Sequence, residues 1–357
     1  MKKLLLLFAL AVVAMPCGAH CPCPSNEIWY TNGSTTEPTK PRDTFDVNII
    51  SNTYYAENEC WVIKFNGEVT TIRFEAFGGC SNLTSVTIPD SVTTIWATAF
   101  GGCSSLREFN GKYASEDGRC LIVDDTLNSF APAGLTEYTI PDSVTTIGNY
   151  AFYSCSSLTS VTIPDSVTTI GAWAFRGCSS LTSVTIPDSV TTIGVSAFSG
   201  CSSLREFNGK YASDNGRCLI IDGTLNSFAP AGLSEYTIPD SVTTIGYGAF
   251  AYCSSLTSVT IPDSVTTIAY KAFSHCSSLT SITIGNSVTT IGWYAFYDCS
   301  SLTSVYCKAI TPPAGGSDMF YNNASGRKIY VPMESVNAYK SAEGWSDYAD
   351  AIVGYNF

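Results

Sequence analysis

The sequence predicts a β-rich α/β solenoid, a coil of stacked and nearly identical units. The motif Ala-Phe-x-x-Cys occurs eight times, and Ile-Pro-Asp-Ser-Val occurs six times with a seventh, altered copy at 284–288. Consecutive copies lie 23 residues apart within each run. A repeat of this length is one supersecondary unit that buries its apolar side only by stacking on copies of itself. Only 13% of the residues are charged, and this composition favours strands over helices.

Each 23-residue unit is predicted to hold two short strands and one helical turn. Its Leu-Thr-Ser-Val-Thr-Ile segment alternates apolar and hydroxyl side chains, which is the period of a half-buried strand. The following Pro-Asp-Ser is typical of a turn, because proline cannot donate to a strand ladder. Val-Thr-Thr-Ile then forms a second extended segment, and Ala-Phe-x-x-Cys-Ser-Ser fits one helical turn. Stacked units should therefore form interior ladders of Leu, Val, Ile, Phe and Cys.

In chain order, the first predicted element is a secretory signal peptide over residues 1–19. Lys2 and Lys3 form its basic region, and residues 4–13 form an apolar core that is too short to span a bilayer. The Cys-Gly-Ala at 17–19 supplies the small residues that signal peptidase reads, so cleavage is expected after this alanine. The protein is therefore expected to be exported, either secreted or held at the cell surface.

Lipid attachment at Cys17 or Cys21 is the alternative to a free mature N-terminus. Neither cysteine follows a good lipobox, because Pro16 and His20 stand where a small residue is expected. No later segment of the sequence is long and apolar enough to span a membrane.

Non-repetitive segments flank the repeats and are expected to cover the two ends of the solenoid. Residues 20–67 contain a polar, Pro/Thr-rich linker at 31–43 and are predicted to form an N-terminal cap. The solenoid itself is predicted to occupy residues 68–305. Residues 306–357 are predicted to form a C-terminal cap, with a last strand followed by a helix whose aromatic residues cover the final unit.

The repeats are not uniform, because two longer units interrupt them. The cysteine spacing is 52 residues instead of 23 at two places, and a 29-residue variant unit accounts for each difference, at Leu106–Gly134 and Leu204–Gly232. Residues 106–203 and 204–301 are therefore two copies of one 98-residue block. Their near identity indicates a tandem duplication.

The charge balance excludes one class of partner. The formal net charge is −12 at pH 7, and removal of the two signal-peptide lysines makes it −14. An acidic surface repels phosphate backbones and anionic lipids. Nucleic acid is therefore not an expected partner.

The repeated motifs resemble the BspA-like branch of the leucine-rich repeat proteins. The signature Ile-Pro-Asp-Ser-Val-Thr-Thr-Ile-Gly…Ala-Phe-x-x-Cys-Ser-Ser-Leu covers about residues 68–305, and the segment 329–345 resembles the ending of bacterial members. The resemblance implies a right-handed parallel solenoid and a secreted or surface-attached protein of anaerobic bacteria. Some members act as adhesins for host matrix proteins or other cells. The family offers no catalytic motif to carry over.

The fifteen cysteines allow two interpretations. An exported protein with many cysteines is a candidate for disulfides, or for a zinc site. However, equivalent residues on stacked strands have parallel Cβ vectors about 4.8 Å apart, beyond the usual Cβ separation in a disulfide of about 3.5–4.5 Å. Cys120 and Cys218 are about four units apart, which also prevents pairing. Buried thiols that pack as small apolar groups are the favoured interpretation, and no metal or cofactor is expected.

Catalysis and calcium binding have weaker support. Asp142, Asp165 and Asp188 repeat at one position and could form a carboxylate ladder, but aspartate at this place is typical of a turn. His20 belongs to or borders the signal peptide, which leaves His275 as the one histidine of the repeats. No nucleophile–base pair or paired-histidine motif is evident. The protein is therefore not expected to be an enzyme, and no catalytic residue is proposed.

The residues that differ most among the units flank the Ala-Phe pair. Because the interior positions are nearly identical in every copy, these variable positions are expected to lie on the surface or at its edge. The predicted ligand-binding residues are Trp96, Tyr150, Tyr153, Trp173, Arg176, Tyr247, Tyr252, Tyr270, Lys271, Trp293, Tyr294 and Tyr297, with Asn149, His275 and Asp298 at similar positions. Such a stripe could bind a partner, since Tyr and Trp provide contact area and a polar group, or it could pack between units.

Two functions are consistent with the sequence. The first is a non-enzymatic surface or secreted protein that binds a host extracellular-matrix or cell-surface protein through one face of the solenoid. The alternative is a glycan-capturing accessory protein of a surface polysaccharide system.

Overall fold

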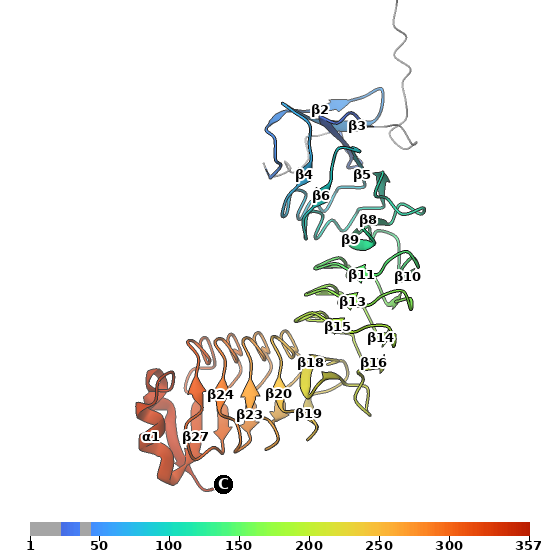
Figure 1. Ribbon diagram of the computed structural model, residues 1–357. Helices are drawn as coiled ribbons and strands as arrows, with labels where there is room; N and C mark the ends of the chain where they lie inside the picture. The colour runs from blue at the N-terminus through green and yellow to red at the C-terminus, as the bar shows by residue number, and fades with distance from the viewer. Residues whose placement is uncertain (1–22, 36–43) are drawn as a thin grey trace, which may run out of the picture.

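The computed structural model describes residues 23–35 and 44–357, and it confirms the predicted solenoid (Figure 1). The predicted signal peptide, the two candidate lipidation cysteines and residues 36–43 of the linker lie outside the described residues. Each repeat unit forms one rung, and successive rungs pair in parallel through two columns of short strands.

The first column, called the first ladder here, is built mainly from the Leu-Thr-Ser-Val-Thr-Ile segments. Equivalent residues pair across rungs, as in Ser258 with Ser281 and Ser281 with Ser304. Its strands are β5 (Ser85–Ile88), β7 (Glu108–Gly111), β10 (Glu137–Thr139), β12 (Ser160–Thr162), β14 (Ser183–Ile186), β16 (Glu206–Gly209), β19 (Glu235–Thr237), β21 (Ser258–Thr260), β23 (Ser281–Ile284), β25 (Ser304–Cys307), β27 (Lys328–Pro332) and β28 (Ile352–Tyr355).

The second column, called the second ladder, is built mainly from the Val-Thr-Thr-Ile segments. Thr146 pairs with Thr169, and Thr169 pairs with Thr192, so the register advances by 23 residues at each rung. Its strands are β4 (Thr71–Ile72), β6 (Thr94–Ile95), β9 (Thr126–Phe130), β11 (Thr146–Ile147), β13 (Thr169–Ile170), β15 (Thr192–Ile193), β18 (Thr224–Phe228), β20 (Thr244–Ile245), β22 (Thr267–Ile268), β24 (Thr290–Ile291) and β26 (Ala314–Gly315).

The third side of each rung is a chain of tight turns, called the turn face here, and the predicted helical turn is wrong. The Arg176 amide donates to the Trp173 carbonyl three residues back, whereas the Phe175 amide donates to Ala197 of the next rung at 2.8 Å. Trp173 and Gly177 also have left-handed backbone, with φ of 55° and 76°. A helix cannot continue through left-handed residues, and the bonds between rungs take amides that a helix would use.

The interior contains the predicted apolar ladders. The Phe175 ring lies 4.9 Å from the Phe152 ring and 5.1 Å from the Phe198 ring, in stacked geometry, and all three side chains are buried. The core is nevertheless divided into three clusters rather than one continuous ladder. The divisions fall at the two 29-residue variant units.

Each variant unit inserts a β-hairpin instead of an Ala-Phe turn. The hairpins are β8 (Cys120–Val123) with β9, and β17 (Cys218–Ile221) with β18, both antiparallel. In the second hairpin, Leu219 packs in the middle cluster, whereas Leu225 and Phe228 pack in the last cluster. The hairpin therefore separates two hydrophobic clusters. We call the variant unit at 106–134 the first joint and that at 204–232 the second joint.

The solenoid changes direction at the second joint. Figure 1 shows the rungs from β11 to β15 stacked along one direction and those from β20 to β27 along a clearly different one. The variant unit contributes to the two ladders but not to the turn face, so the turns on either side approach each other. The Ser196 hydroxyl donates to the Tyr247 carbonyl at 3.1 Å across this gap. The turn face therefore lies on the inner side of the bend.

The two ends of the solenoid are covered. β1 (Glu27–Thr31) pairs antiparallel with β3 (Cys60–Phe65) and with β5, and β2 (Ile49–Tyr55) pairs with β3. At the other end lie η1 (Met333–Ser335), α1 (Val336–Ser341) and η2 (Ser346–Ala351). Tyr339 and Trp345 are buried there, and the Trp345 indole donates to the Pro313 carbonyl at 2.8 Å. These positions fit the proposed caps, whose exact boundaries stay a prediction.

The cysteine ladder consists of buried thiols. Cys155, Cys178 and Cys201 are buried and form no disulfide, as predicted. The Cys178 thiol donates to the Phe152 carbonyl of the preceding rung at 3.1 Å. Burial removes water from the thiolate and raises the pKa of Cys178 from an ordinary value of 9.0 to about 12.

Replacing Phe175 by alanine should lower the free energy of unfolding by about 3–5 kcal/mol, because it leaves a cavity between two stacked rings. Urea unfolding followed by circular dichroism measures this difference. Phe74→Ala is the control, since Phe74 is half exposed and its loss should cost little. A loss below about 1 kcal/mol for Phe175→Ala would contradict the stacked core.

The protein should become less stable as the pH rises above about 9. A thiol of the unfolded chain ionises near its ordinary pKa of 9.0, whereas the folded chain keeps Cys178 protonated up to about pH 12. Its stabilising contribution is therefore complete below the unfolded pKa and decreases by about 1.4 kcal/mol per pH unit until the folded pKa is reached. Urea midpoints at pH 8 and pH 10.5 under reductant measure this, and Cys178→Ala should give a shallower dependence. Equal dependence in both proteins would refute this explanation.

Candidate functional site

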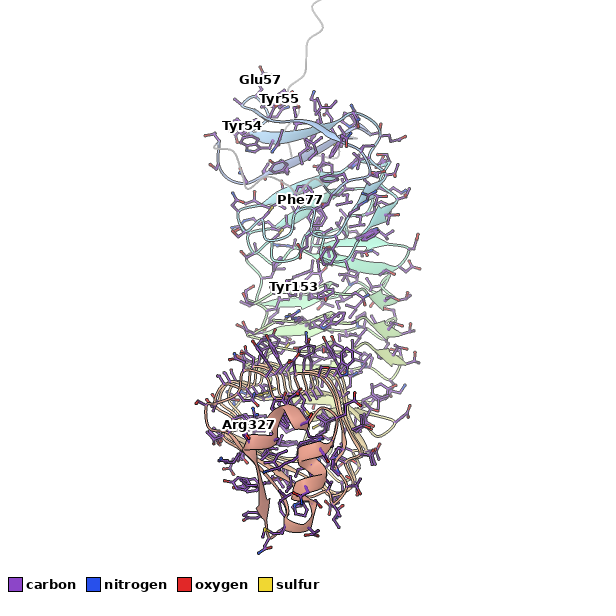
Figure 2. The ribbon with its side chains drawn as sticks, turned by 90° about the vertical axis from the view of Figure 1, so that its left-hand side faces the viewer. Tyr54, Tyr55, Glu57, Phe77, Tyr153 and Arg327 are labelled. Carbon is purple, nitrogen blue, oxygen red and sulfur yellow. The ribbon has the colours of Figure 1, made fainter. Side chains whose placement is uncertain are left out.

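The predicted binding residues lie mainly on the turn face. Each Ala-Phe pair is flanked by four variable positions, three and two residues before the Phe and one and two residues after it. Tyr150 and Trp173 occupy the second of these, Tyr153 and Arg176 the third, and Tyr252 the fourth. Figure 2 looks onto the turn face of the rungs that precede the second joint, with Tyr153 labelled, and along the stack of the rungs that follow it.

Ring contacts connect most of these residues into one band that crosses the second joint. Tyr150 stacks on Trp173 with ring centroids 5.0 Å apart, and Trp173 meets Tyr247 edge to face at 6.0 Å. The band continues through the remaining rungs in the order Tyr247, Tyr270, Tyr294, Tyr297 and Tyr321. We call this set, beginning at Tyr153, the aromatic band. The Lys271 ammonium lies 5.1 Å from the Tyr270 ring centroid.

Two of the predicted tryptophans lie outside the aromatic band. The side chains of Trp96 and Trp293 are 51% and 60% exposed. Within the described residues, neither indole has a ring contact with another aromatic side chain. Trp96 occupies the position where most rungs have glycine, so it is displaced from the column of Tyr150 and Trp173.

The backbone conformation of the turn face does not favour the large side chains found there. Tyr150, Trp173, Tyr252 and His275 have φ between 55° and 66°, the left-handed region that favours glycine. Glycine stands at the equivalent position in some rungs, as at Gly200. A non-glycine residue in this region costs about 1–2 kcal/mol. The large side chains are therefore present in spite of the local backbone preference.

A hollow of about 530 Å³ lies at the second joint. It is placed between the rungs that precede the joint and the rungs that follow it, which we call the two arms of the bend. Tyr153 and Arg176 line it from one arm, and Tyr252, His275 and Asp298 line it from the other. The rest of its lining consists of small residues: Ser154, Gly177, Ser199, Gly200, Ser254, Ser277 and Ser300. We call it the joint hollow.

Polar contacts organise the joint hollow. The Arg176 guanidinium lies 5.8 Å from the Tyr153 ring centroid and 5.5 Å from that of Tyr252, and its Nη2 donates to the Tyr252 hydroxyl at 3.2 Å. His275 Nδ1 is 2.8 Å from an Asp298 carboxylate oxygen, and its ring stacks on Tyr252 with centroids 4.6 Å apart. The sequence alone does not bring Arg176 to Tyr252, since 76 residues separate them.

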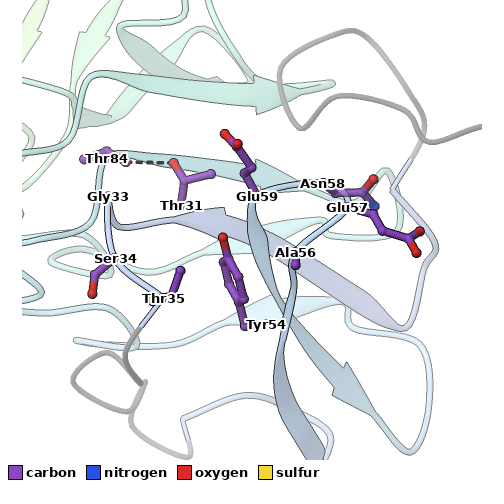
Figure 3. A pocket seen from close by; sticks show the side chains of 10 residues that line it. All are labelled: Thr31, Gly33, Ser34, Thr35, Tyr54, Ala56, Glu57, Asn58, Glu59 and Thr84. Carbon is purple, nitrogen blue, oxygen red and sulfur yellow. Dashed lines mark hydrogen bonds between the residues drawn. The ribbon is translucent and has the colours of Figure 1, made fainter.

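A second hollow, of about 660 Å³, lies at the N-terminal end (Figure 3). Tyr54, Glu57, Asn58 and Glu59 line it, and the Thr31 hydroxyl hydrogen-bonds to that of Thr84 at its edge. Its lining ends at Thr35, next to residues outside the described ranges. Its residues form no aromatic or basic cluster, so the joint hollow is the stronger candidate.

The repeated aspartates lie in the turns that follow the strands of the first ladder. Asp165 and Asp188 are exposed, and the Asp263 carboxylate accepts a hydrogen bond from the Asn286 amide of the next rung at 2.9 Å. Among the residues that the structure describes, no three His, Cys, Asp or Glu side chains are grouped closely enough to hold a metal ion. In the same ranges, no helix has the length and apolarity needed to cross a bilayer.

The family follows from the repeats. A family model described as the BspA type leucine-rich repeat region matches the chain in six copies, over residues 47–115, 126–213 and 224–342. This chain belongs to the BspA-type leucine-rich repeat family. The predicted resemblance is therefore confirmed. The unmatched residues 116–125 and 214–223 fall in the variant units.

The chain is also similar to solved structures of bacterial leucine-rich repeat proteins. A leucine-rich cell surface protein from Faecalibacterium prausnitzii A2-165 is 26% identical, with 79% of this chain and 85% of that chain covered and a TM-score of 0.48. A leucine-rich repeat protein from Bacteroides ovatus ATCC 8483 is 24% identical, with coverage of 86% and 90% and a TM-score of 0.41. The pneumococcal vaccine antigen PcpA is 18% identical, with coverage of 81% and 85% and a TM-score of 0.48. No curated protein matches the chain.

Proposed function

We propose that this BspA-type protein is an exported, non-enzymatic binding protein. Its turn face, on the inner side of the bend, recognises a host extracellular-matrix or cell-surface protein. The secretory pattern of residues 1–19 supports export, and the aromatic band supports binding. Lipid attachment at Cys17 or Cys21 remains part of the proposal for a surface-held form.

The observation that carries this proposal is a comparison of the chain with itself. The two 98-residue blocks, 106–203 and 204–301, have twelve pairs of equivalent positions beside the Phe of their Ala-Phe turns, and all twelve pairs differ. Only nine of the other 86 pairs differ. The turn face has therefore changed since the duplication, while the rest of the block has stayed nearly constant.

Exposure alone does not account for this pattern. Thr162 and Ser156 are exposed, yet Thr260 and Ser254 at the equivalent positions are identical to them. The turn face, which is mostly half buried, differs at every flanking position. If these side chains served only to pack between rungs, the left-handed backbone would favour glycine at several of them. A changing ligand surface explains both observations.

Capture of a glycan is the second candidate function. The hydroxyl-rich lining of the joint hollow favours it, because serine and tyrosine hydroxyls are suited to bind sugar hydroxyls. Both functions use the same face, and the chemistry of the ligand separates them.

Removing the centre of the aromatic band should weaken binding at least about tenfold, as expected for buried aromatic anchors. The test variant combines Trp173→Gly with Tyr247→Ala, since glycine suits the backbone at position 173. Binding of the mature protein to immobilised matrix proteins, host cells and a glycan array measures the effect.

Tyr355→Ala is the control, because this exposed tyrosine lies at the end of the first ladder, away from the turn face. Its binding should equal that of the wild type. Circular dichroism establishes that each variant is folded. Unchanged binding by the folded band variant would rule out the turn face as the binding surface.

A further inference from the structure

We propose that the joint hollow binds a sugar residue that carries a carboxylate group, with Arg176 as the partner of that carboxylate. This inference rests on the proposed binding function of the turn face and names the ligand chemistry at one place on it. Such a residue could belong to the glycan of a host surface protein.

Among the described residues, no Asp or Glu side chain forms an ion pair with Arg176. The ion pairs among the described residues are Lys64 with Glu27 and His275 with Asp298, and neither involves this guanidinium. The side-chain contacts of Arg176 are the rings of Tyr153 and Tyr252 and the hydroxyls of Tyr252 and Tyr150. A guanidinium has five N–H donors, so donors remain for a ligand.

The rings on either side hold this guanidinium in place. Cation–π contacts with Tyr153 and Tyr252 fix it between the two arms, at the edge of the hollow. A planar and pre-positioned guanidinium is suited to a carboxylate, which it can bind through two parallel hydrogen bonds.

The rest of the hollow suits a sugar ring. Tyr252 is 39% exposed and stacks on His275, so the pair offers an apolar surface beside the guanidinium. Serine hydroxyls at 154, 254, 277 and 300 can donate to and accept from sugar hydroxyls. Gly177 and Gly200 have no side chains to fill the space. The volume of about 530 Å³ is within the usual range for small-ligand pockets, about 300–1,000 Å³.

Charge selects a single carboxylate over a polyanion. The formal net charge of −12 repels acidic chains and nucleic acids at a distance. One carboxylate on an otherwise neutral and hydroxylated ligand meets the positive charge of Arg176, while the Asp298 carboxylate of the same hollow is held by His275. An acidic peptide shares the carboxylate but offers few hydroxyl groups to the serines, so the sugar is the favoured ligand.

The first joint supplies an internal comparison. It has the same hairpin and the same loss of a turn, but the position equivalent to Arg176 is Gly78 and that equivalent to Tyr252 is Ser154. The hairpin and the missing turn therefore do not by themselves produce the arginine–tyrosine contact. This contact is specific to the second joint.

The test uses two pairs of small probes that differ only in charge. These are the methyl α-glycoside of N-acetylneuraminic acid and methyl β-glucuronide, each compared with its own methyl ester. Ligand-observed NMR titration of the mature protein measures the affinities. At least one acid should bind about ten times more tightly than its ester, as expected for a charge-assisted hydrogen-bonded pair.

Arg176→Gln should reduce the affinity for the acid to that for the ester. Arg205→Gln makes the same charge change at an exposed residue beside the strands of the same joint, and it should leave both affinities unchanged. Equal binding of acid and ester by the wild type would overturn the inference, and so would unchanged binding by Arg176→Gln.

Binding of a short glutamate-rich peptide, with the same dependence on Arg176 and without binding of either sugar acid, would also overturn the inference. It would assign the hollow to a protein carboxylate. The outcome for the proposed function is separate. If neither sugar acid binds but the aromatic-band variant still loses adhesion, the turn face stays the binding surface and only the sugar inference fails.

Discussion

The hydrogen-bonded register between equivalent residues of successive rungs is the constraint on which the rest of the molecule depends. Thr146 pairs with Thr169, and Thr169 pairs with Thr192. All the remaining positions of the 23-residue unit must therefore also lie above their own copies. Phe therefore stacks on Phe and Cys on Cys inside, and the variable residues beside each Phe form a column outside. One pairing rule thus separates a fixed interior from a surface that can change.

The two variant units show what happens when this register is interrupted. Each inserts a hairpin and omits one Ala-Phe turn, so the ladders gain strands while the turn face loses a turn. The adjacent turns close over the gap, as the Ser196–Tyr247 hydrogen bond shows. The bend that results places Arg176 against Tyr252 and joins the aromatic rings of the two arms. The position of the aromatic band and of the joint hollow on the inner side of the bend is thus a consequence of the missing turn.

The sequence predicts the rungs well because each motif states its own local chemistry. The alternation around Val161 predicts a strand, and Phe175 is buried where the repeat predicts it. It does not predict the left-handed backbone at Trp173, since an aromatic residue there opposes the local preference and only the stacked rungs impose it. The contact between Arg176 and Tyr252 depends on the direction of the bend. The sequence feature that points to the bend is the 52-residue cysteine spacing, because it shows that one Ala-Phe turn is missing.

The central claim is that the variant unit bends the solenoid. Deletion of residues 204–232 tests it most directly, together with Tyr236→Val, which restores the valine of the regular units. The deletion joins Ser203 to Leu233 and restores a spacing of 23 residues between Cys201 and Cys253. Small-angle X-ray scattering measures the largest dimension of the deleted and intact proteins. The account predicts a longer molecule after the deletion, although it has 29 fewer residues, because the two arms become one straight stack. A molecule of equal or smaller length, folded and monomeric, would contradict it.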